Sequence, residues 1–159
     1  IFNAIKICRR NDIHTNIFLI LGFPTETQKE INDTITFGRR CKADLMGIRI
    51  LVPLPGADIF DYAIKNKILP ADLVDRYARG ELGKGFVGSW PLFIPEGLRL
   101  SDLVEAKKKA YLNFYFNPAW ILRRIRYYIR HPERLKDDVR LFRALPQVLR
   151  FGKTKGAMS

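Results

Sequence analysis

The chain has 159 residues, of which 47% are hydrophobic, and its 28 lysines and arginines outnumber 16 aspartates and glutamates to give a formal net charge of +12. This length and apolar content exclude an intrinsically disordered chain and predict one domain with a sizeable core. No apolar run approaches the roughly 20 residues that a membrane-spanning helix needs. The charge is uneven, because residues 118–159 carry 11 of the basic residues and only 3 of the acidic ones. The basic C-terminal quarter therefore predicts contact with an anionic surface.

The start of the chain and its two cysteines predict whether the chain is a fragment and in which compartment it resides. It opens with Ile1 in a helical pattern, without an initiator methionine or a signal peptide, so we expect a fragment that begins inside a larger protein. Cys8 and Cys41 have neither a disulfide-framework spacing nor a metal-ligand spacing. We interpret both as small buried hydrophobic residues and expect a reducing, cytoplasmic compartment, with membrane association as an open alternative.

The first half of the chain predicts a strand, a helix and a second strand. Residues 1–10 should end a preceding helix. Residues 16–22 are almost entirely apolar, which predicts a parallel strand covered on both faces. A helix should follow, with Thr25 as its N-cap and Gln28 as its capping-box partner. Residues 45–52 predict the second strand, so the three elements form a βαβ unit whose strands end at the same edge.

Both predicted strands end in turns that contain glycine and proline. The first is Gly22-Phe23-Pro24 and the second is Pro53-Leu54-Pro55-Gly56. In α/β folds this edge is where ligands bind. Arg49 is a cation within the second strand, on the face opposite Ile48 and Ile50. Two interpretations of Arg49 stay open: it binds a substrate carboxylate or phosphate, or it pairs with a helix carboxylate such as Asp58 or Asp61.

The second half is less regular at first and then helical. Residues 57–66 predict a short helix, and residues 67–100 form a connection rich in glycine and proline. Residues 83–88 match the spacing G-x-G-x-x-G, but without a preceding strand and a following helix we favour a flexible loop over a phosphate site. Three helices should follow within residues 101–151, beginning at Ser101, at Asn117-Pro118 and near Pro132. The residues after 151 should be a disordered tail.

Two of these stretches resemble the radical S-adenosylmethionine enzymes. Ile20-Leu21-Gly22-Phe23-Pro24-Thr25-Glu26-Thr27 is similar to the fifth-strand signature of that family, Ile-x-Gly-x-Pro-Gly-Glu-Thr, with Thr25 in place of the glycine. Val52-Pro53-Leu54-Pro55-Gly56-Ala57 is similar to the sixth-strand motif, which usually ends Pro-x-Pro-Gly-Thr. Leu100-Ser101, then Phe114-Tyr115-Phe116-Asn117-Pro118 and the arginine-rich helix resemble the C-terminal part of the cobalamin-binding branch.

The resemblance implies an α/β fold, with the last strands and helices of a partial (β/α)6 TIM-like barrel followed by C-terminal α-helices. Residues 1–66 would then be the C-terminal portion of the barrel, residues 67–100 an irregular connection, residues 101–151 a basic helical extension and residues 152–159 the tail. The family's Cys-x3-Cys-x2-Cys motif is absent from the sequence. We therefore expect the ligands of a [4Fe–4S] cluster, and any cobalamin domain, in a missing N-terminal part of the same protein.

The resemblance also implies an enzyme that generates a 5′-deoxyadenosyl radical from S-adenosylmethionine and then transfers a methyl group or rearranges a small-molecule or lipid substrate. Ile20 matches the strand residue that packs on the adenine, and Gly22 the position where the backbone approaches the cofactor. Val52 and Pro53 match residues that border the adenine. Ile20 as barrel core and Gly22 as a turn residue remain alternatives. The chain alone, which supplies no catalytic residue and no metal ligand, is expected to be inactive.

The basic residues 118–150 leave three possibilities open. Their helices pack on the barrel with the arginines outward, lie on an anionic membrane with Trp120, Tyr127 and Tyr128 at the interface, or bind nucleic-acid phosphates. The alternative to an enzyme is accordingly a non-catalytic basic α/β module for an anionic membrane surface or nucleic acid. A tRNA-methylthiolating radical enzyme is a third possibility, although that type usually ends in a small β-rich domain rather than in helices.

Overall fold

The computed structural model describes residues 1–81, 94–135 and 139. In this part of the chain β1 (Asn16–Leu21) and β2 (Leu45–Ile50) pair in parallel, from Asn16 opposite Leu45 to Leu21 opposite Ile50. The predicted strand–helix–strand order is therefore confirmed. The helices are α1 (Phe2–Arg10), α2 (Gln28–Arg40), α3 (Asp58–Lys65), α4 (Leu73–Ala78), α6 (Leu100–Tyr115), α7 (Pro118–Arg130) and the short 3-10 helix η1 (Pro132–Arg134).

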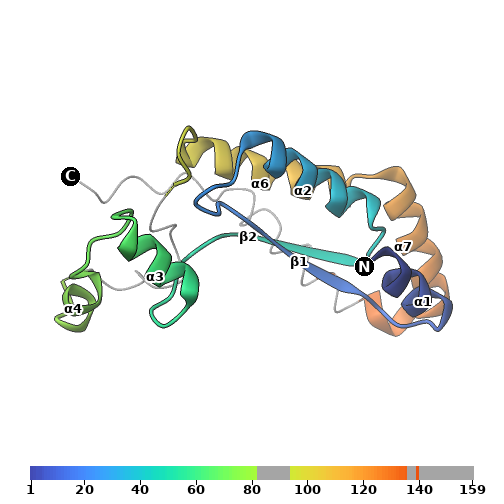
Figure 1. The fold of residues 1–159 in the computed structure, drawn as a ribbon. Coiled ribbons are helices and arrows are strands. Elements are labelled where there is room, and N and C mark those ends of the chain that lie inside the picture. The colour runs from blue at the N-terminus through green and yellow to red at the C-terminus, as the bar shows by residue number, and fades with distance from the viewer. Residues whose placement is uncertain (82–93, 136–138, 140–159) are drawn as a thin grey trace.

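One face of the strand pair carries the main core. Helices α2 and α6 lie side by side over this face (Figure 1), and α6 supplies Leu103 and Phe114, both almost fully buried. A Cβ atom on Gly38 of α2 would lie 3.0 Å from both Leu19 Cδ1 and Met46 Sδ. The glycine therefore allows α2 to approach the sheet closely. Because α6 shares this core with both strands, it is an integral layer of the βαβ unit.

The outer edge of β2 is covered by aromatic side chains rather than by another strand. The Tyr115 hydroxyl accepts from the Met46 amide at 3.1 Å and donates to the Met46 carbonyl at 2.9 Å. The Tyr111 hydroxyl makes the same two contacts with Ile48, at 3.2 and 3.4 Å. Trp120 Nε1 donates to the Asp44 carbonyl at 3.0 Å. These contacts satisfy edge groups that would otherwise be buried without partners.

Two helix starts differ from the expectations. The N-cap of α2 is Thr27 with Glu30 as its capping-box partner, in place of Thr25 and Gln28. Thr25 does not cap the helix, because the carboxylate of the next residue, Glu26, accepts hydrogen bonds from amides of the preceding turn. Helix α6 begins at Leu100, where the Asp102 carboxylate accepts from the Arg99 amide at 2.9 Å, so Ser101 lies inside the first turn. The start of α7 is as predicted, since the Asn117 side chain caps the Ala119 amide.

The expectation that both faces of the first strand are covered is wrong for the described residues. Burial alternates along β1, and Phe18 is 73% exposed and Ile20 45% exposed. Phe18 lies opposite Gly47 and Ile20 opposite Arg49 on the same side of the sheet. We call this side, formed by Phe18, Ile20, Gly47 and Arg49, the open face. An apolar open face on parallel strands is unusual, because such strands are normally covered on both sides.

A second, smaller cluster joins the elements after β2. Phe60 and Ala63 of α3 pack against Leu69 and Leu73, and Leu51 contacts the same group. The predicted helix over residues 57–66 is thus confirmed as α3, whereas α4 lies in the stretch for which no helix was predicted. The glycine-rich residues 83–88, most of the predicted third C-terminal helix and the tail lie outside the described residues.

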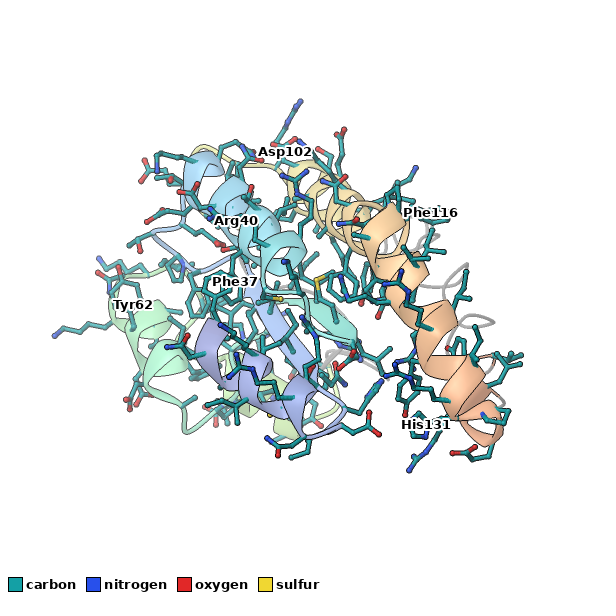
Figure 2. The ribbon with its side chains drawn as sticks, turned by 90° about the vertical axis from the view of Figure 1, so that its right-hand side faces the viewer. Phe37, Arg40, Tyr62, Asp102, Phe116 and His131 are labelled. Atoms are coloured by element: carbon teal, nitrogen blue, oxygen red, sulfur yellow. The ribbon has the colours of Figure 1, made fainter. Side chains whose placement is uncertain are left out.

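Helix α7 is held to the domain by one of its sides. Trp120 and Arg124 are buried, and the Arg124 guanidinium lies 4.8 Å from the Tyr127 ring and 2.6 Å from His14 Nε2. Because arginine has no acceptor, His14 must accept through an unprotonated Nε2. His131, just beyond α7, reaches Asp12 at 3.0 Å. Figure 2 shows α7 running from Phe116 to His131 along one side of the molecule.

This contact predicts a pH dependence of stability. Partial burial, and next the charge of Arg124, lower the pKa of His14, while Asp44 opposes and Arg134 reinforces the shift. A histidine whose folded pKa lies below its unfolded value destabilises the fold as pH falls through the unfolded value of about 6.5 toward the folded one. Between about pH 7 and pH 5, the free energy of unfolding measured in urea should therefore fall more for the unchanged protein than for the variant H14Q. The glutamine side chain keeps a neutral hydrogen-bond acceptor at both pH values. An equal fall in unfolding free energy for both proteins would contradict a role for His14 protonation beside Arg124.

Candidate functional site

The first strand ends in a turn that requires glycine. Gly22 is buried with a φ of 92°, and the Glu26 carboxylate accepts from the amides of Gly22 and Phe23. A Cβ atom on Gly22 would lie 3.4 Å from Ile50 Cγ2 and from Leu103 Cδ1. These are ordinary van der Waals distances, so the positive φ alone is sufficient to explain the glycine. The Gly22 turn is therefore pre-formed, with its amides held by a carboxylate from within the chain.

The second strand ends beside the first. The Leu51 amide donates to the Leu21 carbonyl at 2.7 Å, which carries the pairing one residue past β2. Val52 is half-buried and Pro53 is almost fully buried. A turn then follows, with the Ala57 amide bonded to the Leu54 carbonyl at 3.1 Å. Val52 and Pro53 thus lie next to the Gly22 turn, at the edge where the sequence predicts a site.

The open face extends along the two strands to this edge. Ile20 and Arg49 are register partners and are both exposed. One step earlier, the Phe18 ring covers the Gly47 backbone so closely that a Cβ atom there would lie 2.9 Å from Phe18 Cδ1. The structure therefore brings an apolar surface, one cation and two glycine turns together. That combination suits a planar apolar ligand that carries an anionic group.

Arg49 forms no ion pair with the described residues, so its predicted pairing with Asp58 or Asp61 is not observed. Lys107 of α6 lies near it. This lysine is only 7% exposed, and burial, followed by the charge of Arg49, lowers its pKa.

From the sequence alone, the run Lys107-Lys108-Lys109 is interpreted as a solvated surface, and the burial of Lys107 corrects this interpretation. Lys107 is four residues from Leu103 and from Tyr111, and both neighbours are buried. It consequently belongs to the core-facing side of the helix. This four-residue spacing from Leu103 and Tyr111 is visible in the sequence and is the signal that identifies Lys107 as core-facing.

No group of three histidine, cysteine, aspartate or glutamate side chains that could hold a metal occurs in the described part of the chain. Cys41 is buried and Cys8 half-buried, and both are free thiols. Burial raises the pKa of Cys41. A protonated, buried thiol suits a core residue better than a ligand.

A relative from Pyrococcus horikoshii, named as an uncharacterized methyltransferase, is 26% identical to this chain over 123 residues. The matched region covers 77% of this chain and 25% of the relative, so the chain spans about a quarter of the relative's length. No protein-family model matches the chain, and no solved structure matches it. The chain is thus similar to one part of a much longer protein whose name assigns it to the methyltransferases.

Proposed function

We propose that this chain is part of a methyl-transferring enzyme of the radical S-adenosylmethionine type and forms one wall of its adenosyl site. The observation that carries the proposal is the parallel pair β1–β2, whose strands end side by side in the Gly22 and Pro53 turns beside an uncovered apolar face. The methyltransferase name of the relative supports the reaction class. The motif resemblance supports the radical type and the partial (β/α)6 barrel, of which β1 and β2 would be the last strands.

The residues of the open face fit an adenosyl group. Ile20 offers a half-exposed apolar surface next to a strand end, and the positive φ of Gly22 turns the chain sharply beside it. In this proposal Ile20 packs on the adenine, while Gly22, Val52 and Pro53 shape the border of the pocket and exclude water. S-adenosylmethionine, when bound, would supply both a radical precursor and an activated methyl group.

The described residues do not fit a [4Fe–4S] cluster, since such clusters need several cysteine thiolates and this part has only Cys8 and Cys41. The cluster ligands, and a cobalamin domain if the enzyme uses one, would therefore lie elsewhere in a longer polypeptide. About three quarters of the relative's length lies outside the matched region, which leaves ample room for both. The uncovered open face agrees with this arrangement, because the rest of the barrel would cover it.

Arg49 would face the interior of such a barrel. A guanidinium next to an adenosyl pocket, without a carboxylate partner among the described residues, is suited to a substrate carboxylate or phosphate. We therefore propose an anionic substrate, held by Arg49 at the end of β2.

The complete polypeptide encoded by the reading frame that contains this chain provides the test. A preceding region of roughly 150–300 residues, an ordinary domain size, should contain Cys-x3-Cys-x2-Cys. After anaerobic reconstitution with iron and sulfide, the protein supplied with S-adenosylmethionine and a one-electron reductant such as dithionite should release methionine and 5′-deoxyadenosine. I20D should weaken S-adenosylmethionine binding about tenfold or more by placing a charge against the adenine. I7D changes an exposed isoleucine on α1 and is the matched control. Absence of the cysteine motif, or equal affinities for I20D and I7D, would contradict the proposal.

A further inference from the structure

The outward side of α7 is apolar. Ile121, Ile125 and Ile129 follow one another at four-residue spacing and therefore lie along one line of the helix. Their exposure rises along the helix to 51% at Ile125 and 76% at Ile129. Leu122 is exposed beside them. We call these four residues the outer ridge.

The inner contacts of α7 fix the rotation of the helix about its own axis and thereby leave the outer ridge exposed. Trp120 is tied to the Asp44 carbonyl and Arg124 to His14 and to the Tyr128 hydroxyl. Both anchors have low exposure, which directs the isoleucines away from the domain. Of the four arginines of α7 only Arg124 is buried, whereas Arg126 and Arg130 are exposed, as the packing with arginines outward predicts for them. The burial of Trp120 removes this residue from the membrane arrangement considered from the sequence.

An apolar groove adjoins the outer ridge. Its volume is about 330 Å³, and Phe116, Ile121 and Ile125 are among its lining residues. Phe116, at the start of the groove, is strongly exposed. The ridge and groove together form a continuous apolar surface along α7. Isolated exposed apolar residues need no explanation, whereas a continuous strip rimmed by polar groups marks an interaction site.

The charged residues within α7 have one sign. Helix α7 contains four arginines and no acidic residue, and Arg126 and Arg130 are exposed beside the ridge, whereas Arg123 is half-buried. A helix with an apolar strip and an arginine flank is the pattern of a peripheral helix that lies in the headgroup region of a bilayer. No helix of the described residues is long and apolar enough to cross a membrane. Arginines near an anionic leaflet add attraction of about fivefold in affinity per charge.

We propose that α7 docks this protein on an anionic lipid bilayer, with the outer ridge entering the acyl boundary and Arg126 and Arg130 contacting lipid headgroups. The one-sided charge favours an anionic surface over a second copy of this chain, which would place arginines against arginines. The apolar ridge favours a bilayer over nucleic acid, whose phosphates offer nothing for isoleucines to bind. This inference does not depend on the proposed reaction.

Co-sedimentation of the 159-residue chain with vesicles tests the proposal. Binding should be stronger to phosphatidylcholine mixed with phosphatidylglycerol than to phosphatidylcholine alone, and high salt should weaken it. I125S/I129S should reduce the affinity for anionic vesicles about tenfold or more through lost apolar burial. R126Q/R130Q should reduce it about 25-fold on anionic vesicles only. All four side chains are exposed or outward-facing, so circular dichroism should show that the variants fold.

The matched control is I7S/I13S, which removes two exposed isoleucines outside α7 and should bind anionic vesicles like the unchanged chain. Insertion should also shift the tryptophan emission of I129W to the blue on anionic vesicles. Equal binding to neutral vesicles, or unchanged binding by I125S/I129S, would overturn the proposal. So would a loss confined to I7S/I13S. A stable dimer in light scattering that I125S/I129S converts to monomer would overturn it in favour of a second copy.

Discussion

Replacing Tyr111 and Tyr115 together with phenylalanine is expected to lower the free energy of unfolding by about 2–5 kcal/mol. The two hydroxyls bond the amides and carbonyls of Met46 and Ile48, which form the outer edge of β2. Phenylalanine keeps the ring packing but leaves these edge groups buried without partners. An unpaired buried donor or acceptor costs about 1–3 kcal/mol. The change should therefore appear as a lower urea midpoint with an unchanged slope.

The control for this experiment is Tyr62→Phe, because Tyr62 is exposed on α3. A surface change of this kind usually alters stability by less than about 0.5 kcal/mol. Equal midpoints for the double variant and Tyr62→Phe would show that α6 is held to the sheet by apolar packing alone. The outcome also concerns the site, since the same edge carries Arg49, which lies next to Ile48 along β2. In the proposed enzyme, a loosened edge should therefore also lower turnover, although neither tyrosine belongs to the open face.

In the complete polypeptide, the proposed role of Arg49 predicts that Arg49→Met reduces the affinity for an anionic substrate by about ten- to a hundredfold. The guanidinium is exposed on the open face, and no described carboxylate neutralises it. Methionine has a similar reach but cannot donate hydrogen bonds to a carboxylate or phosphate. The loss should appear as a higher KM, and S-adenosylmethionine binding should be unaffected because the adenine contact is assigned to Ile20.

Arg39→Met is the matched control, since Arg39 is exposed in the last turn of α2. Both variants should unfold at nearly the same denaturant concentration, because neither arginine pairs with a described acidic residue. An unchanged KM for Arg49→Met would remove Arg49 from the substrate site. A parallel loss of S-adenosylmethionine affinity would instead place Arg49 at the cofactor and count against the assignment to substrate.

The site residues and the membrane surface differ in how far sequence alone could identify them. Ile20, Gly22, Val52 and Pro53 were proposed from motif resemblance, and the structure places them at adjoining strand ends. Their roles toward a cofactor remain predictions. The sequence does not single out Lys107, because Lys107, Lys108 and Lys109 form one charged run. Position along the helix, and not membership of the run, decides which of the three is buried.

Local signals in the sequence determined the strand–helix–strand order, the sharp turns after both strands and the Asn117-Pro118 start of α7, because these depend on near neighbours in the chain. Only the tertiary structure decided which sides of the elements are covered. Helix α7 has an aromatic–arginine side and an isoleucine side, and its periodicity permits either to face inward. The choice depends on two residues that are distant from α7 in sequence. The Asp44 carbonyl accepts a hydrogen bond from Trp120, and His14 accepts one from Arg124. The same long-range contacts leave the outer ridge exposed.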